Sequence, residues 1–242
     1  MVSSAPDLTS RLLRRERLIV AIGVALLALL SWWFVAAGAG MPDSMGAETP
    51  PFGALVLMWW LMMMAMMLPS AVPAILLYAR VRQAWNNGPA IAQSWIFLCG
   101  YLLVWLLFSI GAAIAQRLSI GASMALDNRY AEGALLLAAG AYQLSPLKSA
   151  CVGVCRSPAQ FISRHWRPGW DGAIRLGLMH GVYCLGCCWL LMALLFVGGV
   201  MNLLWIVALT VAVAAEKLIP GGDWLGRVAG VALAAWGIWL LL

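Results

Sequence analysis

The chain has 242 residues, of which 64% are hydrophobic and only 10% are charged, and its formal net charge is +6. Soluble domains carry about 25% charged residues, so this composition excludes an ordinary soluble protein and predicts an all-α polytopic membrane protein, a transmembrane helix bundle. Disordered and collagen-like chains are excluded too, and continuous apolar runs argue against a β-barrel. The positive charge is not gathered in a basic domain, so no nucleic-acid partner is expected.

Seven apolar runs are candidates for membrane-spanning helices. In chain order they cover residues 18–37, 52–78, 94–115, 131–144, 173–197, 203–215 and 225–242. The fourth is doubtful, because a helix over 131–144 rises only about 21 Å and the hydrocarbon core of a bilayer is about 30 Å thick. We predict one transmembrane helical domain over residues 18–242, preceded by a basic cytosolic segment over residues 1–17.

The basic residues favour seven crossings and give their orientation. With seven crossings, Arg117 and Arg129 fall on one side of the membrane, and the other 13 of the 15 lysines and arginines fall on the opposite side. Without the fourth crossing, the residues from Lys148 to Arg175 would change sides and this bias would be lost. Because short basic loops stay in the cytosol, we predict a cytosolic N-terminus and an external C-terminus.

The first apolar run has an alternative interpretation as a secretory signal peptide. Basic residues from Arg11 to Arg17 precede it, and small residues follow it. Its apolar stretch is about 20 residues, however, whereas that of a signal peptide has about 7 to 15. We therefore predict a membrane anchor that is retained.

Cysteine and histidine are few, and the predicted topology places all of them in the cytosolic half of the membrane or near its midplane. The cysteines are at positions 99, 151, 155, 184, 187 and 188, and the histidines are at positions 165 and 180. Thiols on that side are largely reduced, which excludes an outward-facing disulfide framework. Reduced thiols and imidazoles indicate metal chemistry first.

The densest group is His180, Cys184, Cys187 and Cys188 in the fifth run. Positions i, i+4, i+7 and i+8 share one face of a helix, so these side chains form a single stripe. The alternative is packing, since cysteine behaves as a small apolar residue and Gly186 allows a close helix contact. An ionisable residue at membrane depth is costly and usually functional, so we favour a metal-binding face.

Cys151 and Cys155 form a CxxxC motif just past the fourth run, at the predicted cytosolic interface. On a helix the two sulfurs share a face, which suits a two-coordinate thiolate site. Metal or redox use and simple packing are alternatives for this pair.

The second run is unusually dense in methionine, with Met58, Met62, Met63, Met64, Met66 and Met67 in ten residues. Positions 58, 62 and 66 lie on one row of a helix and positions 63 and 67 on the next, which gives a ladder of thioethers. Methionine is also an ordinary gap filler, so packing is the alternative. Thioether sulfur selects few ions besides Cu(I) or Ag(I), so we predict Met62, Met66 and Met67 as ligands.

Depth along the membrane connects these groups. Met66 lies about 21 Å from the outer end of its run and Cys187 about 18 Å from the inner end of its own, so both fall near the midplane. The CxxxC motif would lie nearer the cytosol. We therefore predict a ligand series that runs from thioether, through thiolate and imidazole, to the CxxxC motif.

Glu216 and Lys217 end the sixth run at the cytosolic interface. A snorkelling pair is the simplest interpretation of these two residues. The alternative is a metal-supporting or proton-coupling role for the Glu216 carboxylate.

These motifs resemble those of the bacterial predicted metal-binding integral membrane proteins, a domain-of-unknown-function family. The resemblance spans about residues 50–220, and its most specific stretch is His180-Gly-Val-Tyr-Cys-Leu-Gly-Cys-Cys-Trp. It implies a multi-pass protein of the bacterial inner membrane with no established reaction. The metal ligands that it implies are Cys151, Cys155, His180, Cys184, Cys187 and Cys188.

Together these features predict an integral membrane protein that binds a soft metal ion for uptake, transfer or delivery. Cu(I) is the first candidate and zinc the second, since zinc would leave the methionine ladder without a role. The chain has no nucleotide-binding loop, which excludes ATP-driven pumping by this chain alone. The expected partners are the lipid bilayer and a metal-donor or acceptor protein, and a homo-oligomer is left open.

Two alternatives come from other classes of protein. A membrane thiol-disulfide oxidoreductase would exchange electrons between the cysteine pairs and a quinone, although the predicted cytosolic position of the thiols argues against it. A structural or assembly subunit of a membrane complex would use the cysteines and methionines only for packing. We expect no catalytic residues, and an enzyme is the less favoured class.

Overall fold

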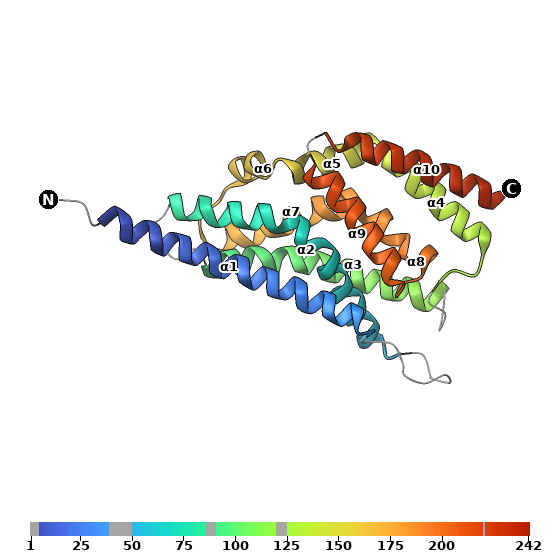
Figure 1. The fold of residues 1–242 in the computed structure, drawn as a ribbon, viewed down its shortest axis with the longest axis horizontal. Coiled ribbons are helices and arrows are strands. Elements are labelled where there is room, and N and C mark those ends of the chain that lie inside the picture. The colour runs from blue at the N-terminus through green and yellow to red at the C-terminus, as the bar shows by residue number, and fades with distance from the viewer. Residues whose placement is uncertain (1–4, 39–49, 86–90, 120–124, 220) are drawn as a thin grey trace.

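The computed structural model describes residues 5–38, 50–85, 91–119, 125–219 and 221–242. Every regular element in these ranges is a helix, which confirms the predicted all-α class. In chain order (Figure 1) they are α1 (Ala5–Ala36), α2 (Phe52–Trp85), α3 (Ile91–Ser119), α4 (Arg129–Gln143), α5 (Pro146–Arg156), α6 (Pro158–His165), α7 (Gly169–Ala193), α8 (Leu195–Gly198), α9 (Leu203–Leu218) and α10 (Asp223–Leu241).

Several helices have the length and composition of membrane spans. Within the described residues these are five segments, Arg15–Ala36, Phe52–Ala84, Ile91–Leu118, Gly169–Gly198 and Asp223–Leu241. They support a membrane protein. The predicted fourth and sixth spans correspond to α4 and α9, which have 15 and 16 residues and rise only about 22 and 24 Å. Seven crossings and the orientation of the termini therefore stay predictions.

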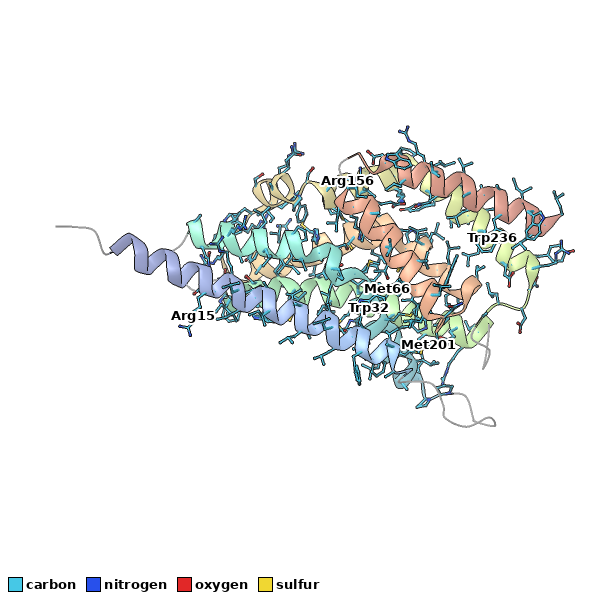
Figure 2. All side chains as sticks on the ribbon, in the orientation of Figure 1. Arg15, Trp32, Met66, Arg156, Met201 and Trp236 are labelled. Atoms are coloured by element: carbon cyan, nitrogen blue, oxygen red, sulfur yellow. The ribbon has the colours of Figure 1, made fainter. Side chains whose placement is uncertain are left out.

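The N-terminal basic segment is continuous with the first apolar run. The described part of residues 1–17 belongs to α1, and residues 1–4 lie outside the described ranges. Arg15 lies near the end of the molecule that carries the N-terminus, Trp236 lies near the opposite end, and Met66 lies between them (Figure 2). The methionine-rich segment is thus far from both ends of the bundle.

Helix α2 forms the core of the molecule, since it contacts α1, α3, α6 and α9. All six methionines between positions 58 and 67 are buried, three of them completely. Pro69 and Pro73 lie inside the helix, where each removes one backbone hydrogen bond. The ribbon of α2 bends part-way along its length (Figure 1), as the two prolines predict.

Close backbone contacts between helices depend on glycine. A Cβ atom added at Gly177 of α7 would lie 2.0 Å from the carbonyl oxygen of Phe97 in α3. A Cβ atom at Gly140 of α4 would lie 2.7 Å from the carbonyl oxygen of Gly230 in α10, and α4 and α10 run side by side (Figure 1). Such small-residue contacts are common in membrane bundles, where helix packing relies on close approach. The α3–α7 contact brings the aromatic side chains of α3 against the cysteine-bearing face of α7.

Helix α5 begins directly after α4 and carries the CxxxC motif. Ser145 caps its N-terminus, because the Ser145 hydroxyl accepts a hydrogen bond from the Lys148 amide, and Pro146 occupies the first turn. The α5 helix contacts α7 and α9. It therefore lies against the interior of the bundle and positions its two cysteines there.

Candidate metal centre

The four residues of the predicted α7 face are all buried. His180, Cys184, Cys187 and Cys188 are at most 3% exposed. The thiols of Cys187 and Cys188 both donate to the carbonyl oxygen of Cys184, at 3.0 Å. The three cysteines therefore form one compact group within two turns of α7.

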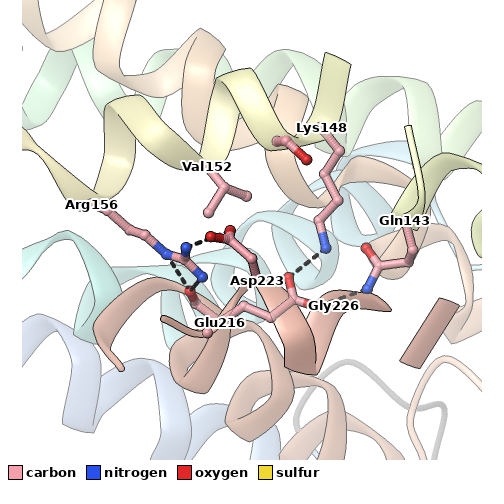
Figure 3. A pocket seen from close by; sticks show the side chains of 9 residues that line it. Gln143, Lys148, Val152, Arg156, Glu216, Asp223 and Gly226 are labelled. Carbon is pink, nitrogen blue, oxygen red and sulfur yellow. Dashed lines mark hydrogen bonds and ion pairs between the residues drawn. The ribbon is translucent and has the colours of Figure 1, made fainter. Parts of the chain in front are cut away.

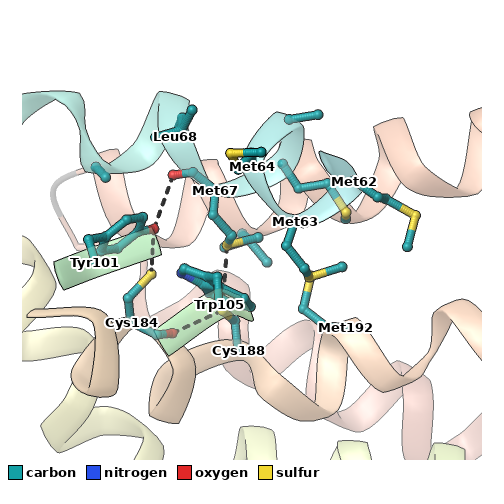
Figure 4. Close-up of a cluster of buried hydrophobic side chains, with 14 of the residues drawn as sticks. Met62, Met63, Met64, Met67, Leu68, Tyr101, Trp105, Cys184, Cys188 and Met192 are labelled. Atoms are coloured by element: carbon teal, nitrogen blue, oxygen red, sulfur yellow. Dashed lines mark hydrogen bonds between the residues drawn. The ribbon is translucent and has the colours of Figure 1, made fainter. Parts of the chain in front are cut away.

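Met67 of α2 joins this group. Its Sδ atom lies 3.7 Å from the Sγ atom of Cys188 (Figure 4). Met62 and Met66 are equally buried, but among the described contacts neither brings its sulfur to a cysteine. The structure thus brings together one of the three predicted thioether ligands with the thiols of α7.

The CxxxC motif lies beside the α7 cysteines rather than beyond them. A Cβ atom added at Gly186 would lie 3.0 Å from the Sγ atom of Cys151, so the absence of a side chain there lets α5 approach. The side chain of Cys155 interacts with those of Cys184 and Cys187. Cys151 thus lies beside Gly186, and Cys155 lies beside Cys184. Because the residue number rises along α5 as it falls along α7, the two helices run antiparallel.

The order of the predicted ligand series across the membrane stays a prediction, but the structure shows how its groups lie relative to one another. The CxxxC motif is predicted just past the fourth run, at the cytosolic interface. Helix α4 ends at Gln143, within one residue of the predicted end of that run, and α5 then packs against α7. Thioether and thiol groups from three helices therefore converge on one place in the bundle.

Two polar side chains reach the same place from α3 and α9. The Tyr101 hydroxyl lies 3.2 Å from the Sγ atom of Cys184 and donates to the carbonyl oxygen of Met67 at 3.4 Å. The Nζ atom of Lys217 lies 3.1 Å from the same Sγ atom, 3.4 Å from the Ser70 hydroxyl and 3.9 Å from the Met67 Sδ atom. Sequence reasoning missed both contacts.

The snorkelling interpretation of Lys217 is wrong, since the residue is only 6% exposed. The available signal was the register of α9, whose buried positions include 206, 209, 210, 213, 216 and 217. By helical periodicity, position 217 falls on this same buried face of α9. Tyr101 carried no comparable signal, because its contact depends on how α3 packs against α7.

Glu216 is also buried, but it points into a different group of side chains. Its carboxylate accepts hydrogen bonds from Lys148 at 2.5 Å and from Gln143 at 2.7 Å (Figure 3). Arg156 donates to the Glu216 carbonyl at 2.8 Å and forms a salt bridge with Asp223 at 2.5 Å. This polar network joins α4, α5, α9 and α10 and fixes the end of α9 from which Lys217 projects.

His180 lies in a pocket of aromatic rings. The centroids of Phe97, Tyr101 and Phe161 are 6.0, 5.8 and 5.7 Å from the centroid of its imidazole ring. Its Nδ1 atom is buried and has no hydrogen-bond partner among the described residues. Buried polar atoms are normally satisfied, so this nitrogen has free capacity for a ligand.

The side chains gathered here offer mainly sulfur atoms as possible donors. In the parts of the chain that the structure describes, no group of three or more His, Cys, Asp or Glu side chains is spaced to hold a metal ion. The thioether of Met67 extends the set beyond those residue types. Sulfur donors of this kind are the ones that soft ions prefer.

Cysteine rotamers would have to change before a metal could be bound. The thiols of Cys187 and Cys188 now point to the Cys184 carbonyl within their own helix. A change of one χ1 angle redirects a cysteine sulfur without moving the backbone. The sulfur atoms are therefore grouped together, and rotamer changes would be needed before they could point at one ion.

A comparison with protein-family models matches residues 56–240 to the PpoB2 family, described as a copper chaperone. No curated protein and no solved structure matches the chain. The matched segment is 185 of the 242 residues and contains every candidate ligand named above. It supports the prediction that this chain handles copper, whereas the description does not mention zinc. The chain belongs to the PpoB2 copper chaperone family.

Proposed function

We propose that the protein is a membrane-embedded carrier that holds Cu(I) in the sulfur cluster of Met67, Cys155, Cys184 and Cys188 and passes the ion to an acceptor protein. The observation that carries this proposal is the convergence of thioether and thiol groups from α2, α5 and α7 in one buried place. Copper is the cargo in this proposal. His180, with a free ring nitrogen one turn from Cys184, supplies a further ligand on the same helix face.

The oxidation state follows from the ligands. Thiolate and thioether sulfurs are soft donors that prefer Cu(I), whereas Cu(II) prefers nitrogen and oxygen donors in tetragonal geometry. A two- or three-coordinate sulfur site also releases its ion by ligand exchange more readily than a closed four-coordinate site. Such a site suits a carrier that must give up the ion.

The proposal places the protein in the bacterial inner membrane with seven crossings and the N-terminus in the cytosol. Five long apolar helices support the membrane location. The α5 helix supports the fourth crossing, because α4 and α5 together provide the length that α4 lacks. The α9 helix would be the sixth crossing.

The test is the copper content and Cu(I) affinity of protein purified without oxygen or chelators. We expect close to one Cu(I) per chain in the unchanged protein, and at least a tenfold loss of affinity in Cys184→Ser. Cys99→Ser is the matched control, because Cys99 is exposed on α3. Equal copper content in Cys184→Ser and Cys99→Ser, with both variants folded, would contradict the site.

A thiol-disulfide oxidoreductase is the second candidate, because Cys155 of α5 faces Cys184 and Cys187 of α7. Two such thiols would form a disulfide, and a quinone would accept the two electrons and two protons. Mass spectrometry would then find a reversible Cys155–Cys184 or Cys155–Cys187 disulfide in metal-free protein. Protein with neither copper nor this disulfide would favour a structural subunit.

A further inference from the structure

The buried lysine of α9 has an unusual set of neighbours. The Nζ atom of Lys217 is in contact with a thiol, a hydroxyl and a thioether, those of Cys184, Ser70 and Met67. A lysine in the interior of a membrane protein is costly and usually has a task. The carboxylate beside it in the sequence does not neutralise it, since Glu216 is bound to Lys148 and Gln143.

Two of the three atoms that Lys217 contacts are also proposed copper ligands. A copper ion bound to Cys184 and Met67 would occupy the space in which the amino group now lies. Both are cations in their ordinary states, and like charges repel strongly at short range in a low-dielectric interior. The amino group and the ion therefore cannot occupy this position together.

Ser70 offers the amino group another partner. The Ser70 hydroxyl donates its hydrogen to the carbonyl oxygen of Met67 at 2.9 Å, which leaves the hydroxyl oxygen free to accept. This oxygen lies 3.4 Å from the Lys217 Nζ atom. A flexible four-carbon side chain can move the amino group from sulfur toward this oxygen.

We propose that the Lys217 amino group holds the copper position in the metal-free protein, withdraws toward Ser70 when copper binds, and thereby weakens copper binding enough for the ion to be released. This inference rests on the proposed copper site and names its affinity-setting residue. The same sulfur site without this competitor would bind Cu(I) more tightly and release it more slowly. The lysine competes with the ion and returns to the sulfurs as the ion leaves.

The experiment measures Cu(I) affinity and the rate of copper transfer to a coloured Cu(I) chelator, with purified full-length protein in detergent under anaerobic conditions. Lys217→Gln removes the charge and adds no soft ligand, so we expect at least tenfold tighter binding and slower transfer. Lys217→Arg keeps the charge, so its affinity should not exceed that of the unchanged protein. Arg227→Gln is the matched control, because it removes an exposed positive charge of α10, and it should leave copper affinity unchanged.

A second variant tests the same inference if Lys217→Gln does not fold. Ser70→Ala removes the alternative partner of the amino group, so copper should bind more weakly. Unchanged or weaker binding in folded Lys217→Gln would overturn the inference, and so would unchanged binding in Ser70→Ala. If the unchanged protein binds no Cu(I), the proposed function itself fails, whereas copper binding that is insensitive to Lys217 and Ser70 refutes only this inference.

Discussion

Cys184 is the residue on which the contacts of the site converge. Its sulfur lies 3.1 Å from the Lys217 amino group and 3.2 Å from the Tyr101 hydroxyl, and its carbonyl accepts from the thiols of Cys187 and Cys188. The α7 face could be predicted because it follows from helical periodicity within one segment. The contacts of Tyr101 and Lys217 could not be predicted in the same way, since they arise from packing between helices.

The methionines of α2 give the first test at the residue scale. Met67→Leu should reduce Cu(I) affinity about tenfold, because only Met67 has a described contact with a cysteine sulfur. Met66→Leu, one position away and also buried, should leave the affinity unchanged. Both swaps conserve volume and should cost less than about 1.5 kcal/mol of stability. Equal affinities in the two variants would assign Met67 to packing.

His180 gives the second test at this scale. Phenylalanine suits the aromatic pocket formed by Phe97, Tyr101 and Phe161, and His180→Phe removes a buried nitrogen that has no partner among the described residues. An unsatisfied buried polar atom costs about 1–3 kcal/mol, so the melting temperature should stay equal or rise. Copper affinity should fall if the imidazole is a ligand. A stable variant with full copper affinity would show that His180 only packs.

Among the elements, α5 has the greatest effect on the site. Apolar periodicity predicts the fourth run over residues 131–144 and the CxxxC motif just past it. Helix α4 ends at Gln143, within one residue of this prediction, and α5 then packs along α7. The missing information was the direction of the chain after the Ser145 cap, which apolar periodicity does not contain. The α5 contact is possible because Gly186 has no side chain to meet Cys151.

The α5–α7 contact can be tested by filling this space. Gly186→Val should push α5 away from α7, because even a Cβ atom there would lie 3.0 Å from the Cys151 sulfur. Overpacking of this kind costs about 1–3 kcal/mol. Because α5 moves away, the yield of the cross-link between Cys155 and Cys184 formed by a short bifunctional thiol reagent should also fall. Gly153→Val is the control, since a Cβ atom at Gly153 meets nothing within 4 Å, and its cross-linking should match that of the unchanged protein.

At the scale of the whole molecule, we predict that the chain crosses the membrane seven times. Composition alone predicts the helical membrane class, because the high apolar content follows from the lipid that surrounds the helices and does not depend on any particular contact between them. The number of crossings depends on α4 and α9, which are shorter than a bilayer core. Five and seven crossings both place the two termini on opposite sides, so a reporter at the C-terminus does not distinguish them.

A reporter inserted between α6 and α7, at Arg167, does distinguish the two topologies. With seven crossings this position lies in the cytosol, as the basic residues predict. With five crossings it lies outside, since neither α4 nor α5 would cross. We expect a cytosolic signal. It is measured with two reporters, of which one is active only in the cytosol and the other only outside it. An external signal would refute seven crossings and place the basic α6 region outside the cell.

The central claim is that copper is held by sulfur in the interior of this bundle. X-ray absorption spectroscopy at the copper edge, on anaerobically loaded full-length protein, tests it most directly because it reports both oxidation state and ligand type. The account predicts Cu(I) with two or three ligands that are mainly sulfur, and a marked loss of sulfur ligation in Cys184→Ser. Copper bound mainly by nitrogen or oxygen, or a spectrum that is unchanged in Cys184→Ser, would contradict it.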